Sequence, residues 1–118
     1  MDDLIFSYSR KQALADGVLI DVTELAKEVG IKVPVAITAT LYNSFIRTEI
    51  PSQDETGRLW DTLVLLVISA KNCNDSTIFF GVSFQITETE YETPMLKAII
   101  GPGDDGSPVI TIMLEGED

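Results

Sequence analysis

The sequence predicts an α+β fold in which N-terminal helices pack on one face of a C-terminal three-stranded antiparallel meander. Apolar residues recur at helical spacing in the first part of the chain, and they alternate with a period of two from residue 78 onward. Helices first and strands last are typical of this class. A chain of 118 residues has room for one hydrophobic core, so we expect a single acidic α+β domain over residues 1–118.

The first two helices are predicted from their capping residues. Ser9 and Gln12 have the spacing of a capping box over the segment RKQALAD, and Gly17 closes this helix. The apolar run VLI that follows suits a strand or a buried connector. Asp21 and Glu24 repeat the cap spacing, so the segment TELAKEV is predicted to be a two-turn helix. Residues 5–8, before the first helix, are predicted to be extended.

The third and fourth helices are predicted from the spacing of their apolar residues. Pro34 is favourable at a first helical position, and a stripe of apolar side chains predicts a helix that runs to about Arg47. The stripe consists of Val35, Ala39, Tyr42 and Ile46, widened by Leu41 and Phe45. After the polar loop at residues 48–56, the length of the segment GRLWDTLVLLVISAK favours a helix, although its β-branched residues leave a buried strand open.

Three strands are predicted where the apolar pattern changes to a period of two. They span residues 78–86, 95–100 and 109–114. The inward positions of the first strand are Ile78, Phe80, Val82, Phe84 and Ile86. Three short strands leave two exposed edges, and the acidic side chains of Glu88, Glu90 and Glu92 are placed to discourage pairing at one of them.

The segment GPGDDG at residues 101–106 matches the spacing G-x-G-x-x-G, but we predict a hairpin loop. A dinucleotide-binding loop is followed by a helix, whereas a strand follows here. Asp104 and Asp105 would place two negative charges where a phosphate must lie, so we expect no cofactor. A weak divalent-ion site is the remaining alternative, although the alternating ligands of an EF-hand are absent.

The charge of the chain limits its partners. A formal net charge of −11 repels the phosphate backbone, so direct binding of nucleic acid is not expected. From Asn72 onward nine acidic residues face one base, Lys97, which gives this part a net charge of −8. Such a surface commonly serves solubility, and its sharper interpretation is a contact area for a basic partner.

Composition excludes several classes of protein. The chain has no histidine and one cysteine, Cys73, so a His-based triad, a Cys/His zinc site and an intramolecular disulfide are ruled out. The longest apolar run, residues 63–70, is far shorter than the roughly 20 residues of a membrane-spanning helix. The acidic start lacks the features of a secretory signal, so we expect a cytoplasmic protein that does not associate with a membrane.

Three segments carry a resemblance to a known family. They are FSYSRKQALADGVLIDVTELAKE at the start, DETGRLWDTL in the middle and LKAIIGPGDDGSPVITIML near the end. In their order they resemble a family of small uncharacterised proteins encoded by bacteria, plasmids, conjugative elements and phages. In that family the helix after the tryptophan is often basic at its end, and LVLLVISAKNCND departs from this feature. The resemblance implies no catalytic residue, because the family has no assigned activity.

Candidate functional residues form two groups. The candidate surface for a basic partner consists of Asp104, Asp105, Glu115 and Glu117. The candidate lining of a cleft between helices and sheet consists of Tyr8, Trp60 and Asp61. Catalysis by carboxylates would need raised pKa values, and Asp21 and Glu24 are better explained as a helix cap and its partner.

Two functions follow from these patterns. The first is a non-enzymatic interaction protein that uses its acidic C-terminal half against a basic host protein, with nucleic-acid mimicry in a mobile-element setting as its specific form. The second is a small enzyme or ligand-binding domain with a cleft between helices and sheet. A homodimer is compatible with either function.

Overall fold

The computed structural model describes residues 8–50 and 53–117 and confirms the α+β class. Of the segment predicted to be extended, residues 5–7 lie outside the described residues. Within the described residues, no helix has both the length and the apolar character that crossing a membrane requires. The elements in chain order are α2 (Arg10–Ala15), β1 (Leu19–Asp21), α3 (Thr23–Glu28), β2 (Val35–Thr38), α4 (Ala39–Leu41), the π-helical turn η1 (Tyr42–Ile46), α5 (Glu55–Ala70), β3 (Thr77–Gly81), β4 (Phe84–Gln85), β5 (Tyr91–Glu92), β6 (Met95–Pro102) and β7 (Pro108–Leu114).

The main sheet has five strands in the order β1-β2-β7-β6-β3, rather than the three that the sequence predicts. Strands β3, β6 and β7 follow one another in antiparallel pairing, and the N-terminal strands β2 and β1 extend the sheet beyond β7. Strand β2 runs parallel to β7 and antiparallel to β1. The predicted hairpin joins β6 to β7, but its loop is residues 103–107 rather than 101–106, because Gly101 and Pro102 still pair with β7; Gly106 is in the left-handed conformation at φ +87°.

The third predicted helix is wrong in its first half, because Val35–Thr38 form strand β2. Val35 and Ile37 are β-branched, fully buried, and hydrogen-bonded between β1 and β7, so the sheet decides their conformation. The helical part begins only after Thr38, whose hydroxyl accepts a hydrogen bond from the backbone N–H of Leu41 at 3.2 Å. The apolar spacing of residues 35–38 is compatible with both a helix and a strand. Pairing with the neighbouring strands β1 and β7 favours the strand.

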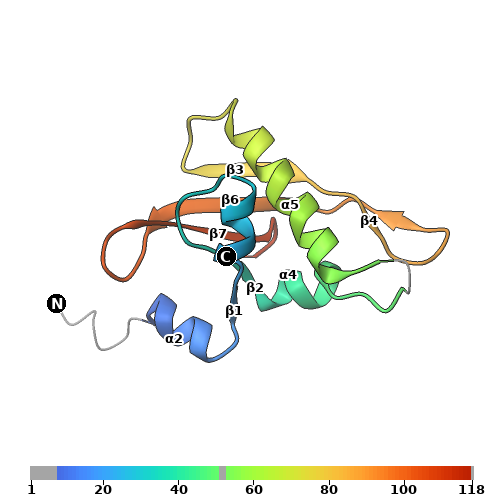
Figure 1. The fold of residues 1–118 in the computed structure, drawn as a ribbon, viewed down its shortest axis with the longest axis horizontal. Helices are drawn as coiled ribbons and strands as arrows, with labels where there is room; N and C mark the ends of the chain where they lie inside the picture. The colour runs from blue at the N-terminus through green and yellow to red at the C-terminus, as the bar shows by residue number, and fades with distance from the viewer. Residues whose placement is uncertain (1–7, 51–52, 118) are drawn as a thin grey trace.

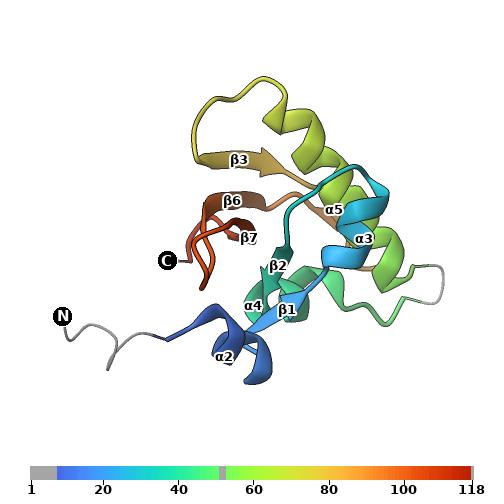
Figure 2. The ribbon, with the colours of Figure 1, turned by 60° about the vertical axis from the view of Figure 1, so that its left-hand side comes forward.

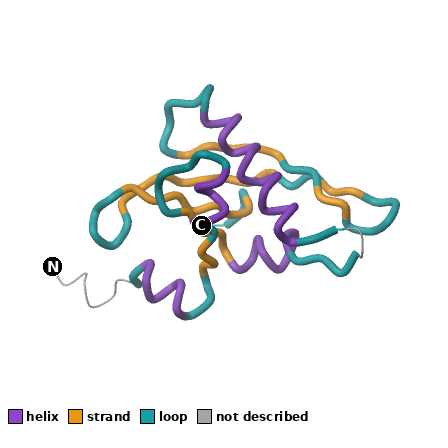
Figure 3. The backbone as a smooth tube through the Cα atoms, in the orientation of Figure 1, coloured by secondary structure: helices purple, strands orange, loops and turns teal. Residues whose placement is uncertain are grey.

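The strand predicted for residues 78–86 is interrupted after Gly81. Strand β3 ends there, and Phe84–Gln85 pair with β5 in a separate two-stranded sheet. The predicted alternation still holds for burial, since Ile78, Phe80, Val82 and Phe84 are all buried. Figure 3 shows the small hairpin projecting past the end of the main sheet. The glutamates predicted to protect a sheet edge therefore lie in this hairpin, while the outer strands of the main sheet are β1 and β3.

The hydrophobic core lies between one face of the main sheet and the helices α3 and α5 (Figures 1 and 2). One row across the sheet consists of Ile20, Ile37, Ile112, Ala98 and Ile78, paired strand by strand. Helix α5, predicted from its length, is confirmed over Glu55–Ala70 and buries Leu63 and Leu66 against this face. The long apolar run is therefore a core helix.

Helix α2 lies on the opposite face of the sheet. Ile110 and Ile112 are buried in the core, so the side chain of Thr111 between them points to the other face. Arg10 of α2 donates a hydrogen bond from Nη1 to Thr111 Oγ1 at 2.6 Å. The cap of this helix is confirmed, because Ser9 Oγ accepts from the backbone N–H of Gln12 at 2.9 Å. The helices therefore do not all pack on one face.

The cap predicted for the second helix is shifted by one residue. The N-cap of α3 is Val22, which makes no side-chain cap bond. Asp21 instead accepts hydrogen bonds from the backbone N–H of Thr23, at 3.0 Å, and from the Thr23 hydroxyl. Asp21 still satisfies an unpaired donor of the first turn, but from strand β1.

Candidate functional site

The acidic residues predicted to bind a partner lie at two ends of the main sheet. Asp104 and Asp105 belong to the loop between β6 and β7, whereas Glu115 and Glu117 follow the far end of β7. The full length of the β6–β7 ladder separates the two pairs. The four carboxylates therefore do not form one continuous surface.

Asp104 and Glu117 make contacts with distant segments, whereas among the described residues Asp105 accepts only a local bond, from the backbone N–H of Ser107 at 2.9 Å. Asp104 accepts hydrogen bonds from the backbone N–H groups of Arg10 and Lys11 at the start of α2, at 2.8 and 2.9 Å. These bonds, led by the one from Lys11, hold the pKa of the Asp104 carboxyl below its usual value. Glu117 accepts from Thr38 Oγ1 and from the backbone N–H of the last residue of β7, both at 2.8 Å. Both side chains help to join distant segments.

The lowered pKa of Asp104 predicts a pH dependence of stability. A carboxyl with a lowered folded-state pKa stabilises the fold above its unfolded value of about 4, and this contribution is lost as the pH falls through the folded value. We expect Asp104→Asn to be less stable than the parent protein at pH 7 and to lose less stability on acidification. Urea unfolding between neutral and strongly acidic pH measures both effects. Asp105→Asn, with the same change in charge, is the control, and equal curves for the two variants would contradict the prediction.

A groove of about 850 Å³ lies between α2 and the second face of the sheet, and it contains three of the predicted residues, Tyr8, Asp104 and Glu117. The hydroxyl of the lining residue Tyr8 donates to Asp16 Oδ2 outside the lining at 2.5 Å, which raises the pKa of Tyr8 and lowers that of Asp16. Arg10 reaches the backbone of β7 at 2.9 Å from Nη2. Partial burial lowers the pKa of the Arg10 guanidinium. The groove is therefore lined by the contacts that hold α2 on the sheet.

The structure does not bring Tyr8 together with Trp60 and Asp61. Trp60 and Asp61 lie on the outer side of α5, where they line a shallow hollow with Val64 and Ser83. Tyr8 lines the groove on the opposite face of the sheet. Of the three residues, only Trp60 and Asp61 share a surface.

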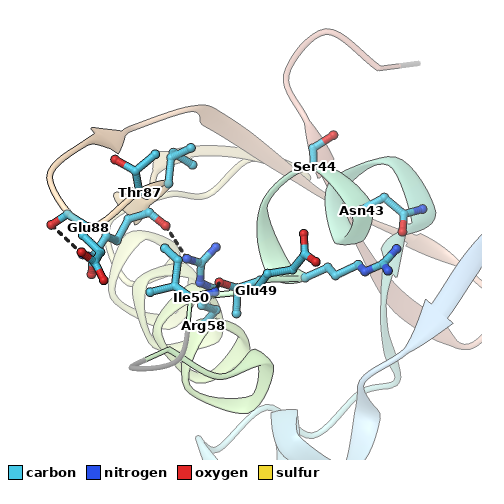
Figure 4. A pocket seen from close by; sticks show the side chains of 11 residues that line it. Asn43, Ser44, Glu49, Ile50, Arg58, Thr87 and Glu88 are labelled. Carbon is cyan, nitrogen blue, oxygen red and sulfur yellow. Dashed lines mark hydrogen bonds between the residues drawn. The ribbon is translucent and has the colours of Figure 1, made fainter.

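A second pocket, of about 660 Å³, lies between the end of η1, the loop at residues 47–50 and the start of the β4–β5 hairpin (Figure 4). Two arginines line it, Arg47 and Arg58, together with the acidic Glu49 and Glu88. Figure 4 shows Glu88 on one side of the pocket and Glu49 on the other, with Arg58 between them. The pocket is therefore lined by both positively and negatively charged side chains. Its remaining lining residues are Asn43, Ser44, Thr48, Ile50, Gln85, Ile86 and Thr87.

Arg58 is the only charged side chain buried among the described residues, with 6% of its surface exposed. Its Nη1 donates to the backbone carbonyl of Phe45 at 2.6 Å, and its Nη2 donates to that of Gln85. The guanidinium lies 5.8 Å from the centre of the Phe84 ring. The Arg58 Nε–H has no acceptor among the described residues. Burial lowers the pKa of this guanidinium, because the charged form is poorly solvated there.

Arg58 was missed by reasoning from the sequence, although a signal was present. Positions 58, 62 and 66 recur every four residues along α5 and are all buried, so Arg58 continues the inward stripe of the helix. Thr62 supports this turn by donating from Oγ1 to the Arg58 carbonyl at 2.8 Å. A charged residue at a core position of an apolar helix marks a site that needs a polar partner.

The fold and these hollows define a small α+β protein with a charged pocket and a β4–β5 hairpin that projects past the main sheet. Among the residues the structure describes, no three His, Cys, Asp or Glu side chains gather to hold a metal ion. The chain belongs to the Family of unknown function (DUF6573), whose model matches residues 1–118. This confirms the resemblance to a family without assigned activity. No curated protein and no solved structure matches the chain.

Proposed function

We propose that the protein is a non-enzymatic interaction protein that binds a basic partner through the β4–β5 hairpin. The observation that carries the proposal is the exposure of three glutamates, Glu88, Glu90 and Glu92, on this projecting element, which we call the acidic hairpin (residues 84–92; Figure 3). From Asn72 onward the sequence has one basic residue, Lys97, and it lies on β6 rather than in the hairpin. No ion pair among the described residues involves these glutamates, so their charge is available to a partner.

An exposed aromatic side chain stands among these glutamates. Tyr91 exposes 65% of its surface, and it precedes Glu92 in strand β5. Tyrosine is enriched at the centres of protein interfaces, because it buries a large ring and keeps a hydroxyl for hydrogen bonding. Tyr91 with flanking carboxylates suits a partner surface that offers an apolar pocket surrounded by lysine or arginine.

The turn of the acidic hairpin is held in shape by its own hydrogen bonds. Thr87 Oγ1 accepts from the backbone N–H groups of Thr89 and Glu90, at 3.3 and 3.0 Å. The backbone N–H of Ile86 donates to the Glu90 carbonyl at 2.8 Å. A recognition element that is ordered before binding loses less conformational entropy on association.

The other candidate acidic residues extend this surface to different degrees. Glu115 is exposed and lies at the end of β7 next to the start of β6, where its backbone N–H donates to the Met95 carbonyl at 3.0 Å. That end of the sheet is the one from which the acidic hairpin arises. Asp105, with Asp104, would contact only a partner that extends along the length of the sheet.

The specific form of the proposal is nucleic-acid mimicry, in which the acidic hairpin occupies a basic channel of a DNA-processing or defence protein. Such channels attract phosphates through lysine and arginine, and carboxylates compete for the same side chains. The net charge of −8 from Asn72 onward supports this form, as does the resemblance to proteins of plasmids and phages. Contacts of this kind are weakened by salt.

The test is affinity capture of the tagged protein from a lysate of its host, with washes at about 50 mM and about 500 mM salt. We expect a basic nucleic-acid-binding protein to be retained at low salt and released at high salt. We further expect the triple variant Glu88→Gln, Glu90→Gln, Glu92→Gln to lose it even at low salt. Mass spectrometry identifies the retained protein.

The matched control neutralises three exposed acids outside the hairpin, as Glu24→Gln, Glu28→Gln, Asp75→Asn. It changes the net charge by the same amount, so it separates a local contact from a general effect of charge. Retention of the partner by the control and its loss from the hairpin variant would support the proposal. Equal retention by both variants, or a complex unaffected by high salt, would overturn it.

A further inference from the structure

We propose that the pocket around Arg58 binds a small zwitterionic ligand of the amino-acid class. In this arrangement Arg58 and Arg47 attract the carboxylate, and Glu49 and Glu88 attract the ammonium group. The site shares Glu88 with the acidic hairpin, whose first residues form one wall of the pocket. It makes no use of Tyr91, Glu90 or Glu92, so it does not depend on the function proposed above.

The charge of Arg58 is not balanced by a carboxylate of the described residues. Buried charges in proteins are normally paired with an opposite charge, because the loss of hydration is otherwise uncompensated. No carboxylate of residues 8–50 and 53–117 forms an ion pair with Arg58, and both of its hydrogen-bond acceptors are neutral carbonyls. A ligand carboxylate at the pocket would supply the missing negative charge.

The same side chain has a hydrogen-bond donor without an acceptor among the described residues. Nearly all buried polar groups in native proteins have a hydrogen-bond partner. The Arg58 Nε–H is fully buried and has no acceptor among the described residues. It belongs to a guanidinium that lines the pocket, so a ligand carboxylate bound in the pocket would lie next to this unpaired donor.

The size and the lining of the pocket suit a small molecule. Its volume of about 660 Å³ is within the range of small-molecule sites. Asn43 and Ser44 are exposed and line the wall contributed by η1, where their polar side chains can bond a ligand. Ile50 and Ile86 provide apolar surface for an aliphatic group. The lining therefore matches a molecule with charged and apolar parts.

The signs of the charges around the pocket decide between classes of ligand. Two arginines alone would suit a phosphate or a nucleotide, but Glu49 and Glu88 lie on opposite sides of the same pocket (Figure 4). They would repel a polyanion, as would the net charge of −11. They attract a cationic group instead. A ligand that carries one carboxylate and one ammonium group would pair with the arginines and with one of the two glutamates.

The experiment is calorimetric titration of the whole protein with the twenty free L-amino acids, each at up to about 10 mM. Acetate and inorganic phosphate are titrated as anions alone, and ethylamine as a cation alone. We expect at least one amino acid to bind at least about tenfold more tightly than each of these simple ions. The ¹⁵N-detected resonance of the Arg58 Nε–H should shift on binding, because a carboxylate comes to lie next to this group.

Arg47→Gln tests the site without disturbing the buried guanidinium, since Arg47 is exposed. We expect it to weaken binding of that amino acid by about tenfold. The control Lys32→Gln removes the same charge from an exposed position that does not line the pocket, and it should leave the affinity unchanged.

Three results would overturn the proposal. The first is the absence of measurable binding by every amino acid in the panel. The second is binding by acetate or phosphate that is as tight as the tightest amino acid, which would indicate an anion site. The third is binding that Arg47→Gln leaves unchanged, or that leaves the Arg58 Nε–H resonance in place.

Discussion

Replacing Leu63 by alanine is expected to lower the free energy of unfolding by about 3–5 kcal/mol. Leu63 is fully buried on α5 and belongs to the main hydrophobic cluster. Truncation removes its contacts and leaves a cavity, because the surrounding elements are tied by the sheet and cannot collapse fully. Urea unfolding followed by the fluorescence of Trp60, the single tryptophan, measures the change.

The control for this prediction is Ile68→Ala on the same helix. Ile68 exposes 52% of its surface, so its truncation is expected to change the free energy of unfolding by less than about 1 kcal/mol. A similar loss of stability in both variants would mean that α5 does not present Leu63 to the core. It would contradict the packing of α5 on the sheet.

Replacing Arg58 by methionine is expected to lower the free energy of unfolding by about 2–4 kcal/mol. The change removes the donors to the carbonyls of Phe45 and Gln85 and leaves two partly buried acceptors without partners. Part of this loss is offset, because burying the charged guanidinium costs free energy in the parent protein and this cost is absent from the variant. Urea unfolding gives the total effect, and hydrogen exchange of the β4–β5 amides reports whether the acidic hairpin loosens.

Arg58→Lys distinguishes the hydrogen bonds from the charge. A lysine ammonium keeps the charge but cannot match the planar fork that reaches both carbonyls, so we expect an intermediate loss of stability. Arg47→Gln, at an exposed position, should unfold like the parent protein. An Arg58→Met protein as stable as the parent would show that the carbonyls of Phe45 and Gln85 find other donors.

The elements predicted correctly from the sequence depend on contacts between near neighbours in the chain. The cap of α2 is one example, because the Ser9 hydroxyl and the Gln12 amide that it accepts from are three residues apart. The hairpin at residues 101–106 is another, since its closing bond joins Gly103 N to the Ser107 carbonyl at 2.7 Å. Such signals are complete within a short window of sequence.

The candidate site was predicted less well from the sequence. Glutamates 88, 90 and 92 were assigned to the protection of a sheet edge, because the strand before them was expected to continue to residue 86. Regular pairing stops after Gly81, where Val82 N still donates to the Pro94 carbonyl at 3.3 Å but Pro94 has no N–H to return a bond, and the glutamates lie in the hairpin beyond this point. An alternating pattern gives burial correctly but does not show which strand is the partner.

The α+β class, the start of α2, the helical state of α5 and the hairpin between β6 and β7 were determined by the sequence alone, because periodicity, capping and turn residues act locally. Only the tertiary structure decided that Val35–Thr38 are a strand, since β1 and β7 on either side bind their backbone and bury them. It also decided the role of Arg58, whose guanidinium is enclosed by Phe45 and Gln85, 13 and 27 residues away. The physical reason is that burial and backbone pairing depend on segments that only folding brings together.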